Sequence, residues 1–229
     1  MTNSARPHSP RLVLFDLDGT LIDSEPGITA SLGYAFAQIG AELPARDVLR
    51  TWIGPPFRQT FPSVLGDDAA RIDAAIGHYR TRFEDIGWSE HAVYDGIADL
   101  IGAIANRGDA LAIVTTKPQH QAQRIIDHLP FGAAFARVYG PDEQHAHSVK
   151  ADMIAQALRD FGARPEYSVM IGDRHFDIEG ARANDVRGVG VAWGFGSLEE
   201  LREAGADAIA HSPPELSGLL DGAARESMS

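Results

Sequence analysis

Short apolar runs alternate with amphipathic helical patterns along most of the chain. A first run occupies residues 12–15 and a last one residues 208–211, and the runs between them lie at residues 111–116, 136–140, 168–173 and 188–193. The segments after these intermediate runs repeat their apolar residues at helical spacing. Short buried strands that alternate with helices are typical of a parallel sheet covered on both faces. The pattern therefore predicts an α/β fold with a Rossmann-like, doubly wound parallel sheet, in which 208–211 adds an edge strand.

The alternation stops between residues 24 and 88, where helical patterns follow one another without a strand between them. Apolar residues share a helical face first at Ile28, Leu32, Phe36 and Ile39, and later at Ile72, Ile76, Tyr79, Phe83 and Ile86. Ordinary crossover helices are the alternative, but the length of the segment favours an α-helical cap inserted after the first strand. We expect a core of residues 11–23 and 89–220, a cap of residues 24–88, and flexible tails at residues 1–10 and 221–229.

The overall charge limits the partners that this chain is expected to have. Its 20 basic and 32 acidic residues give a formal net charge of -12. Such a surface disfavours nucleic-acid polymers and anionic membranes as partners. The chain has no cysteine, which excludes disulfides and thiolate metal sites. Because no secretory signal and no run of membrane-spanning length is visible, we expect a cytoplasmic protein that is a monomer or a homodimer.

Polar residues gather at the points where the predicted strands end. Ligands of such sheets bind beyond the carboxyl ends of the strands, so these residues are the candidates for chemistry. The candidates at these ends, or at the start of the following helices, are Asp16, Asp18, Thr115, Thr116, Lys117, Lys150, Asp173 and Asp177. The sequence thus predicts several carboxylates, hydroxyl groups and lysines at one edge of one sheet.

In their order and spacing these residues resemble the motifs of the haloacid dehalogenase-like superfamily of phosphohydrolases. Asp16-Leu17-Asp18-Gly19-Thr20-Leu21 is similar to the first motif, and Thr115 and Lys150 fit the second and third. Gly172-Asp173 together with Asp177 resembles the acidic fourth motif. The resemblance covers residues 12–211, and the helical insertion is similar to the α-helical cap of this family. Any one motif is a weak signal, whereas the ordered set is a strong one.

The resemblance implies a catalytic role for four of these residues. Asp16 would be the nucleophile that forms an aspartyl-phosphate, and Asp18 would act first as general acid and then as general base. Thr115 would donate its hydroxyl to a phosphoryl oxygen, and Lys150 would place its positive charge beside the phosphoryl group and Asp16. On its own, each residue also has a structural explanation, such as a helix cap or a strand end.

The resemblance also implies a magnesium ion as cofactor. Mg²⁺ prefers oxygen ligands, which the carboxylates of Asp16 and Asp173 and the backbone carbonyl of Asp18 would supply. The role of Asp177 stays open between binding Mg²⁺ through water, orienting Lys150 and lying solvated in the first turn of a helix.

Residues for the rest of the substrate are harder to find. Thr116 and Lys117 are candidates for substrate contact, with a position on the rim as the alternative for Lys117. Arg58 follows Gly54-Pro55-Pro56 in the predicted cap and is expected to pair with a second anionic group of the substrate. A solvated helical arginine is the equal alternative.

The predicted function is a magnesium-dependent phosphomonoesterase for a small phosphorylated metabolite. The segments IGPPFRQTF, TTKPQ and GDRHFDIEGARAN resemble the branch of phosphoglycolate phosphatases and 5'-nucleotidases. The presence of Asp18 argues against a dehalogenase. The absence of lysine between residues 12 and 109 argues against an enzyme that cleaves phosphonates. A phosphosugar mutase and a catalytically silent regulatory or binding protein remain as alternatives.

Overall fold

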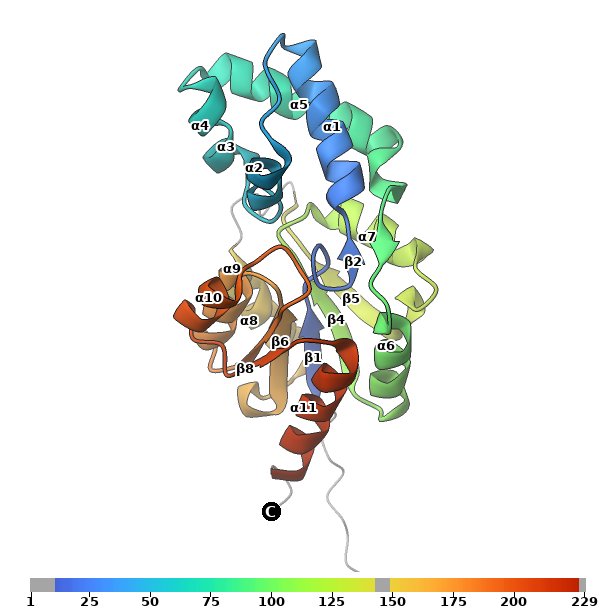
Figure 1. The fold of residues 1–229 in the computed structure, drawn as a ribbon. Helices are drawn as coiled ribbons and strands as arrows, with labels where there is room; N and C mark the ends of the chain where they lie inside the picture. Colours follow the sequence, from blue (N-terminus) through green and yellow to red (C-terminus); the bar gives the residue numbers. More distant parts are fainter. Residues whose placement is uncertain (1–10, 143–148, 227–229) are drawn as a thin grey trace, which may run out of the picture.

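Six parallel strands form the central sheet of the protein (Figure 1). The computed structural model describes residues 11–142 and 149–226. The strands have the order β5-β4-β1-β6-β7-β8 and are β1 (Leu12–Phe15), β4 (Ala110–Val114), β5 (Phe135–Tyr139), β6 (Ser168–Gly172), β7 (Arg187–Val191) and β8 (Ala208–Ala210). The chain starts in the middle of the sheet and builds outward in both directions, which confirms the doubly wound α/β fold. β8 is the predicted edge strand.

Alternating side chains of the strands face two helical layers. Val13 and Phe15 of β1 belong to a buried cluster with apolar residues of α6 (Ile97–Asn106) and α7 (Gln119–His128). Leu12 and Leu14 point to the opposite face and pack with residues of α8 (Lys150–Phe161) and α9 (His175–Arg182). The strand is therefore apolar on both faces, which is why it reads as an uninterrupted apolar run in the sequence.

Two further helices complete the core after β7. These are α10 (Leu198–Glu203) and α11 (Pro213–Glu226). α11 continues to Glu226 and so includes residues 221–226, which were expected to belong to the C-terminal tail. Residues 1–10 and 227–229 of the expected tails lie outside the described residues. Within the described part of the chain, no helix is long and apolar enough to cross a membrane.

Consecutive helices fill the segment in which a cap was expected. They are α1 (Glu25–Gln38), α2 (Arg46–Thr51), α3 (Phe57–Thr60), α4 (Pro62–Leu65) and α5 (Ala69–Asp85). They lie together above the core in Figure 1, where α1 and α5 pack against each other. The chain leaves and re-enters the core through a short antiparallel pair, β2 (Ile22–Asp23) with β3 (Ala92–Val93).

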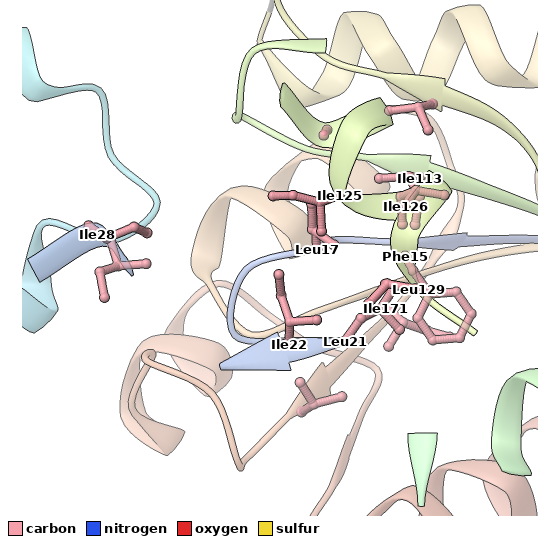
Figure 2. Packing of buried hydrophobic residues seen from close by; sticks show 14 of the residues in the cluster. Phe15, Leu17, Leu21, Ile22, Ile28, Ile113, Ile125, Ile126, Leu129 and Ile171 are labelled. Atoms are coloured by element: carbon pink, nitrogen blue, oxygen red, sulfur yellow. The ribbon is translucent and has the colours of Figure 1, made fainter. Parts of the chain in front are cut away.

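The loop that follows β1 is anchored by buried apolar side chains. Leu17, Leu21 and Ile22 belong to the same cluster as Phe15 in the sheet (Figure 2). Ile28 extends this cluster into α1. Because Phe15 and Leu17 are both fully buried, the backbone around Asp16 has little freedom to turn its carboxylate elsewhere.

Candidate active site

The ends of two neighbouring strands bring three carboxylates together. Asp16 follows β1 and Asp173 follows β6, and these strands pair in parallel register, with the Asp16 N–H donating to the Ile171 carbonyl at 2.9 Å. Asp177 joins them from the first turn of α9. One carboxylate oxygen from each of the three aspartates lies within 4.8 Å of the others, and all three residues are buried.

Lys150 supplies a positive charge to this group of carboxylates. It is the first residue of α8, its Nζ lies 2.9 Å from Oδ1 of Asp16, and it also pairs with Oδ1 of Asp177. Burial lowers the pKa of the Lys150 ammonium, but the two carboxylates outweigh burial and the pKa is raised above its usual value. The lysine is therefore charged at neutral pH and held against Asp16.

Asp177 contacts Lys150 and does not lie in solvent. Its side chain is fully buried, and its second oxygen, Oδ2, accepts a hydrogen bond of 3.0 Å from the Arg174 backbone N–H. That bond also caps the amino end of α9. Of the three alternatives left open by the sequence, the solvated position is wrong, and the contact with Lys150 is present.

Burial disfavours the ionised form of the Asp16 and Asp173 carboxylates. It raises the pKa of Asp16 to about 6, with Lys150 opposing the shift, and it raises the pKa of Asp173 to about 8, with Asp16 and Asp177 adding to the shift. Asp173 still accepts two hydrogen bonds, from the Phe195 N–H at 2.7 Å and from the Thr20 hydroxyl at 3.3 Å. A nearby cation would favour the ionised form of both groups.

The donor set at this edge of the sheet suits a magnesium ion. All the available groups are oxygens, which is the preference of Mg²⁺. Oδ1 of Asp16 is buried beside Lys150, and Oδ1 of Asp18 is buried without a hydrogen-bond partner among the described residues. Asp16, Asp173 and the Asp18 backbone carbonyl are thus compatible with the predicted ligand set.

Asp18 lies beside the loop that follows β4. Lys117 places its Nζ 3.0 Å from Oδ2 of Asp18 and 4.6 Å from the centre of the Phe83 ring of α5. The Lys117 backbone N–H donates to the Thr115 hydroxyl at 3.2 Å. Lys117 and Thr115 are both buried, so Lys117 is not a rim residue, which corrects that alternative.

The structure does not bring the remaining two candidates to the carboxylates. The Thr116 hydroxyl donates to the carbonyl of Gly54 at 2.9 Å. Arg58 is two-thirds exposed and pairs with Asp73 of α5 at 2.6 Å. Its side chain matches the solvated-arginine alternative, so the expectation that Arg58 reads the substrate has no support in this arrangement.

Sequence reasoning missed several residues that shape the site. Arg174 directly follows Asp173, and Phe195 lies in the loop after β7, between two glycines. Thr20 belongs to the first motif, and its hydroxyl bonds Asp173. The signal for Arg174 and Thr20 was their position beside motif residues, whereas the backbone N–H of Phe195 leaves no trace in the sequence.

Comparison with known proteins agrees with this geometry. A sequence model of the family described as haloacid dehalogenase-like hydrolase matches residues 13–191. The chain belongs to this family. Among the relatives of the chain, a 5'-nucleotidase of Pseudomonas aeruginosa is 42% identical over 190 residues, which cover 83% of this chain and 86% of that protein. A predicted phosphatase from Clostridium acetobutylicum has a solved structure that matches with a TM-score of 0.85 and 35% identity, covering 92% of this chain and 98% of the other.

Two further relatives carry other names. Tyrosine-protein kinase PtkA of Mycobacterium tuberculosis is 35% identical over 210 residues, 91% of this chain and 71% of PtkA. A phosphoglycolate phosphatase of Pseudomonas putida is 29% identical over 192 residues, 81% of this chain and 71% of that protein. The similarity therefore extends to proteins named for different reactions of phosphoryl groups.

Proposed function

We propose that the protein is a magnesium-dependent phosphomonoesterase that hydrolyses a small phosphorylated metabolite through an aspartyl-phosphate on Asp16. One observation carries the proposal: the buried carboxylate of Asp16 stands at the end of the central strand, paired with Lys150 and next to Asp173. A strand-end carboxylate with a fixed ammonium group is suited to attack phosphorus, because the ammonium group stabilises the charge that develops on the phosphoryl oxygens.

The first half-reaction transfers the phosphoryl group to the protein. A carboxylate oxygen of Asp16 attacks the phosphorus atom, the bond from phosphorus to the ester oxygen breaks, and Asp18 gives its proton to the departing alkoxide. Lys150 stays within reach of the reacting carboxylate because Asp177 holds it from the other side. A magnesium ion held by Asp16, Asp173 and the Asp18 carbonyl would neutralise part of the negative charge of the phosphoryl group.

The second half-reaction returns Asp16 to its initial state. Asp18, now ionised, takes a proton from a water molecule, whose oxygen attacks the phosphorus of the aspartyl-phosphate. The bond between phosphorus and Asp16 breaks and inorganic phosphate is released. Lys117 holds the Asp18 carboxylate at Oδ2, and within the described part of the chain Oδ1 has no hydrogen-bond partner, which supports proton transfer at Oδ1.

For the substrate we propose a small metabolite such as a 5'-nucleotide or phosphoglycolate. The named activities of the Pseudomonas relatives support these two classes. The acidic surface supports small molecules over nucleic-acid polymers or membranes as partners, and we propose that the protein acts in the cytoplasm as a monomer or homodimer.

A phosphate-release screen tests the proposal. The wild-type protein, Asp16→Asn and the surface control Asp73→Asn are incubated with 5'-nucleotides, phosphoglycolate and sugar phosphates, with magnesium or with excess chelator. We expect release by wild type and control in magnesium only, and a loss of about a thousandfold or more in Asp16→Asn because the nucleophile is removed.

The same screen distinguishes the other possibilities. Full activity in chelator, or activity of Asp16→Asn near that of wild type, would contradict the proposal. Conversion of one sugar phosphate isomer into another without phosphate release would indicate a mutase. No reaction with any substrate would favour a silent binding protein. Incubation with ATP and a tyrosine-containing peptide reports whether the protein shares the activity for which PtkA is named.

A further inference from the structure

A turn between α2 and α3 reaches from the cap helices to the core. It contains Ile53, Gly54, Pro55 and Pro56, and Gly54 has a φ of +108°, a conformation that favours glycine. Pro55 and Pro56 have no backbone N–H, so the turn itself offers few donors for its carbonyl oxygens. Ile53 is nevertheless buried, and its carbonyl requires a donor from elsewhere.

Two side chains of the core supply these donors. The Thr116 hydroxyl donates to the Gly54 carbonyl at 2.9 Å, and Nη1 of Arg174 donates to the Ile53 carbonyl. Thr116 follows β4 and Arg174 follows β6, and these strands flank β1 on either side. The two hydrogen bonds therefore hold one turn of the cap segment from both sides of the strand that ends at Asp16.

The guanidinium of Arg174 is itself held in place. Its Nε lies 2.9 Å from Oε1 of Glu200 in α10, and the same oxygen accepts a bond from the His175 backbone N–H at 2.9 Å. The Arg174 side chain is 12% exposed, so it has little freedom to leave this position. Its backbone N–H bonds Asp177, so one residue contacts both the carboxylate that orients Lys150 and the turn of the cap segment.

We propose that Thr116 and Arg174 are positioning residues that latch the Gly54 turn, and with it the cap helices, over the carboxylate of Asp16. Thr116 thus acts through the backbone of the turn and not by contact with substrate. Gly54 fits the latch because a Cβ atom at this position would lie 3.2 Å from Nη1 of Arg174 and force it to shift. The inference deepens the proposed phosphatase function, since closure of the turn over Asp16 would exclude water from the reacting group.

The latch can be measured without any substrate. The chain has no cysteine, so Ala74→Cys on α5 and Ala103→Cys on α6, both at exposed positions, accept a pair of nitroxide labels for distance measurement by double electron–electron resonance. In this background Thr116→Val removes the hydroxyl and keeps the shape. Thr81→Val is the matched control, because the Thr81 hydroxyl bonds only the Gly77 carbonyl of its own helix among the described residues.

We expect one dominant label distance in the parent and in Thr81→Val. Thr116→Val should add a second population and lower the ratio of closed to open molecules about two- to tenfold, the usual effect of one net hydrogen bond. Glu200→Gln, which loosens Arg174 from within the core, should shift the same ratio in the same direction.

The inference is overturned if the distance distributions of Thr116→Val and Glu200→Gln superimpose on that of Thr81→Val. Should Thr116→Val fail to fold, Glu200→Gln alone decides. Because the readout is a distance and not phosphate release, a failure of the latch and a failure of the proposed phosphatase activity are seen in separate experiments.

Discussion

Replacing Asp173 with asparagine is expected to make the protein without magnesium more stable at neutral pH. The Asp173 carboxyl is fully buried, and burial raises its pKa to about 8 from a usual value of 3.8. At pH 7 the folded protein therefore keeps a proton that the unfolded chain releases. The difference of about 3 pH units corresponds to about 4 kcal/mol in favour of unfolding. Asparagine has no proton to lose and still offers an oxygen to the Phe195 N–H.

The sign of the effect follows from proton binding. Between about pH 4 and pH 8 the folded state binds more protons at Asp173 than the unfolded state does, so the free energy of unfolding falls as pH rises, by up to about 1.4 kcal/mol per pH unit. Asp16, with a pKa of about 6, contributes in the same direction up to pH 6. The pKa of Glu25 is lowered from its usual value of 4.5, chiefly by the hydrogen bond from Arg46, so this group makes the free energy of unfolding rise with pH, and its effect is confined to pH values up to about that usual value.

Urea unfolding in excess chelator at pH 5, 6, 7 and 8 measures this free energy. The stability of wild type should fall across the series, and that of Asp173→Asn should fall less, so that the gap between them widens toward pH 8. Asp73→Asn is the control, because Asp73 is half exposed and its removal should shift stability by less than about 1 kcal/mol at every pH.

Added magnesium should narrow the difference in stability between the two proteins. An ion that binds the ionised carboxylate stabilises the folded state by mass action, and it does so more strongly as pH rises. Wild type should gain stability from magnesium and Asp173→Asn should gain little. A wild-type stability in chelator that is constant or rising from pH 5 to pH 8, together with no gain in Asp173→Asn, would refute the reasoning from burial.

Two other substitutions test the ion pairs. Lys150→Met leaves Asp16 and Asp177 buried without their cation and should lower the free energy of unfolding at pH 7 by about 3–5 kcal/mol, measured by urea unfolding; an unchanged value would contradict the buried pairing. Arg58→Ala removes an exposed ion pair worth about 0.2–1 kcal/mol and should change kcat/KM less than twofold for any substrate; a tenfold loss confined to substrates with a second anionic group would return Arg58 to the site.

The alternation of apolar runs and helical patterns was sufficient to predict the sheet and the edge at which the candidate residues gather. Strands buried on both faces are uniformly apolar, so β1, β4 and β6 stand out in the sequence and their carboxyl ends can be located. The resemblance to a family added the roles that we propose for Asp16 and Lys150. β2 and β3 escaped prediction because two-residue strands carry no periodicity, and α6 was not singled out although it is amphipathic.

Only the tertiary structure determined which groups the polar side chains bind. Lys117 was a weak candidate in sequence and is buried against Asp18, whereas Arg58 was the favoured cap residue and pairs with Asp73 at the surface. The hydrogen bond from Arg174 to Ile53 joins residues 121 positions apart, and local pattern contains no information about such a pair. The physical reason is that the periodicity of the sequence determines only which face of a helix or strand is buried. The packing of the helices against one another and on the core determines which partner a polar side chain reaches.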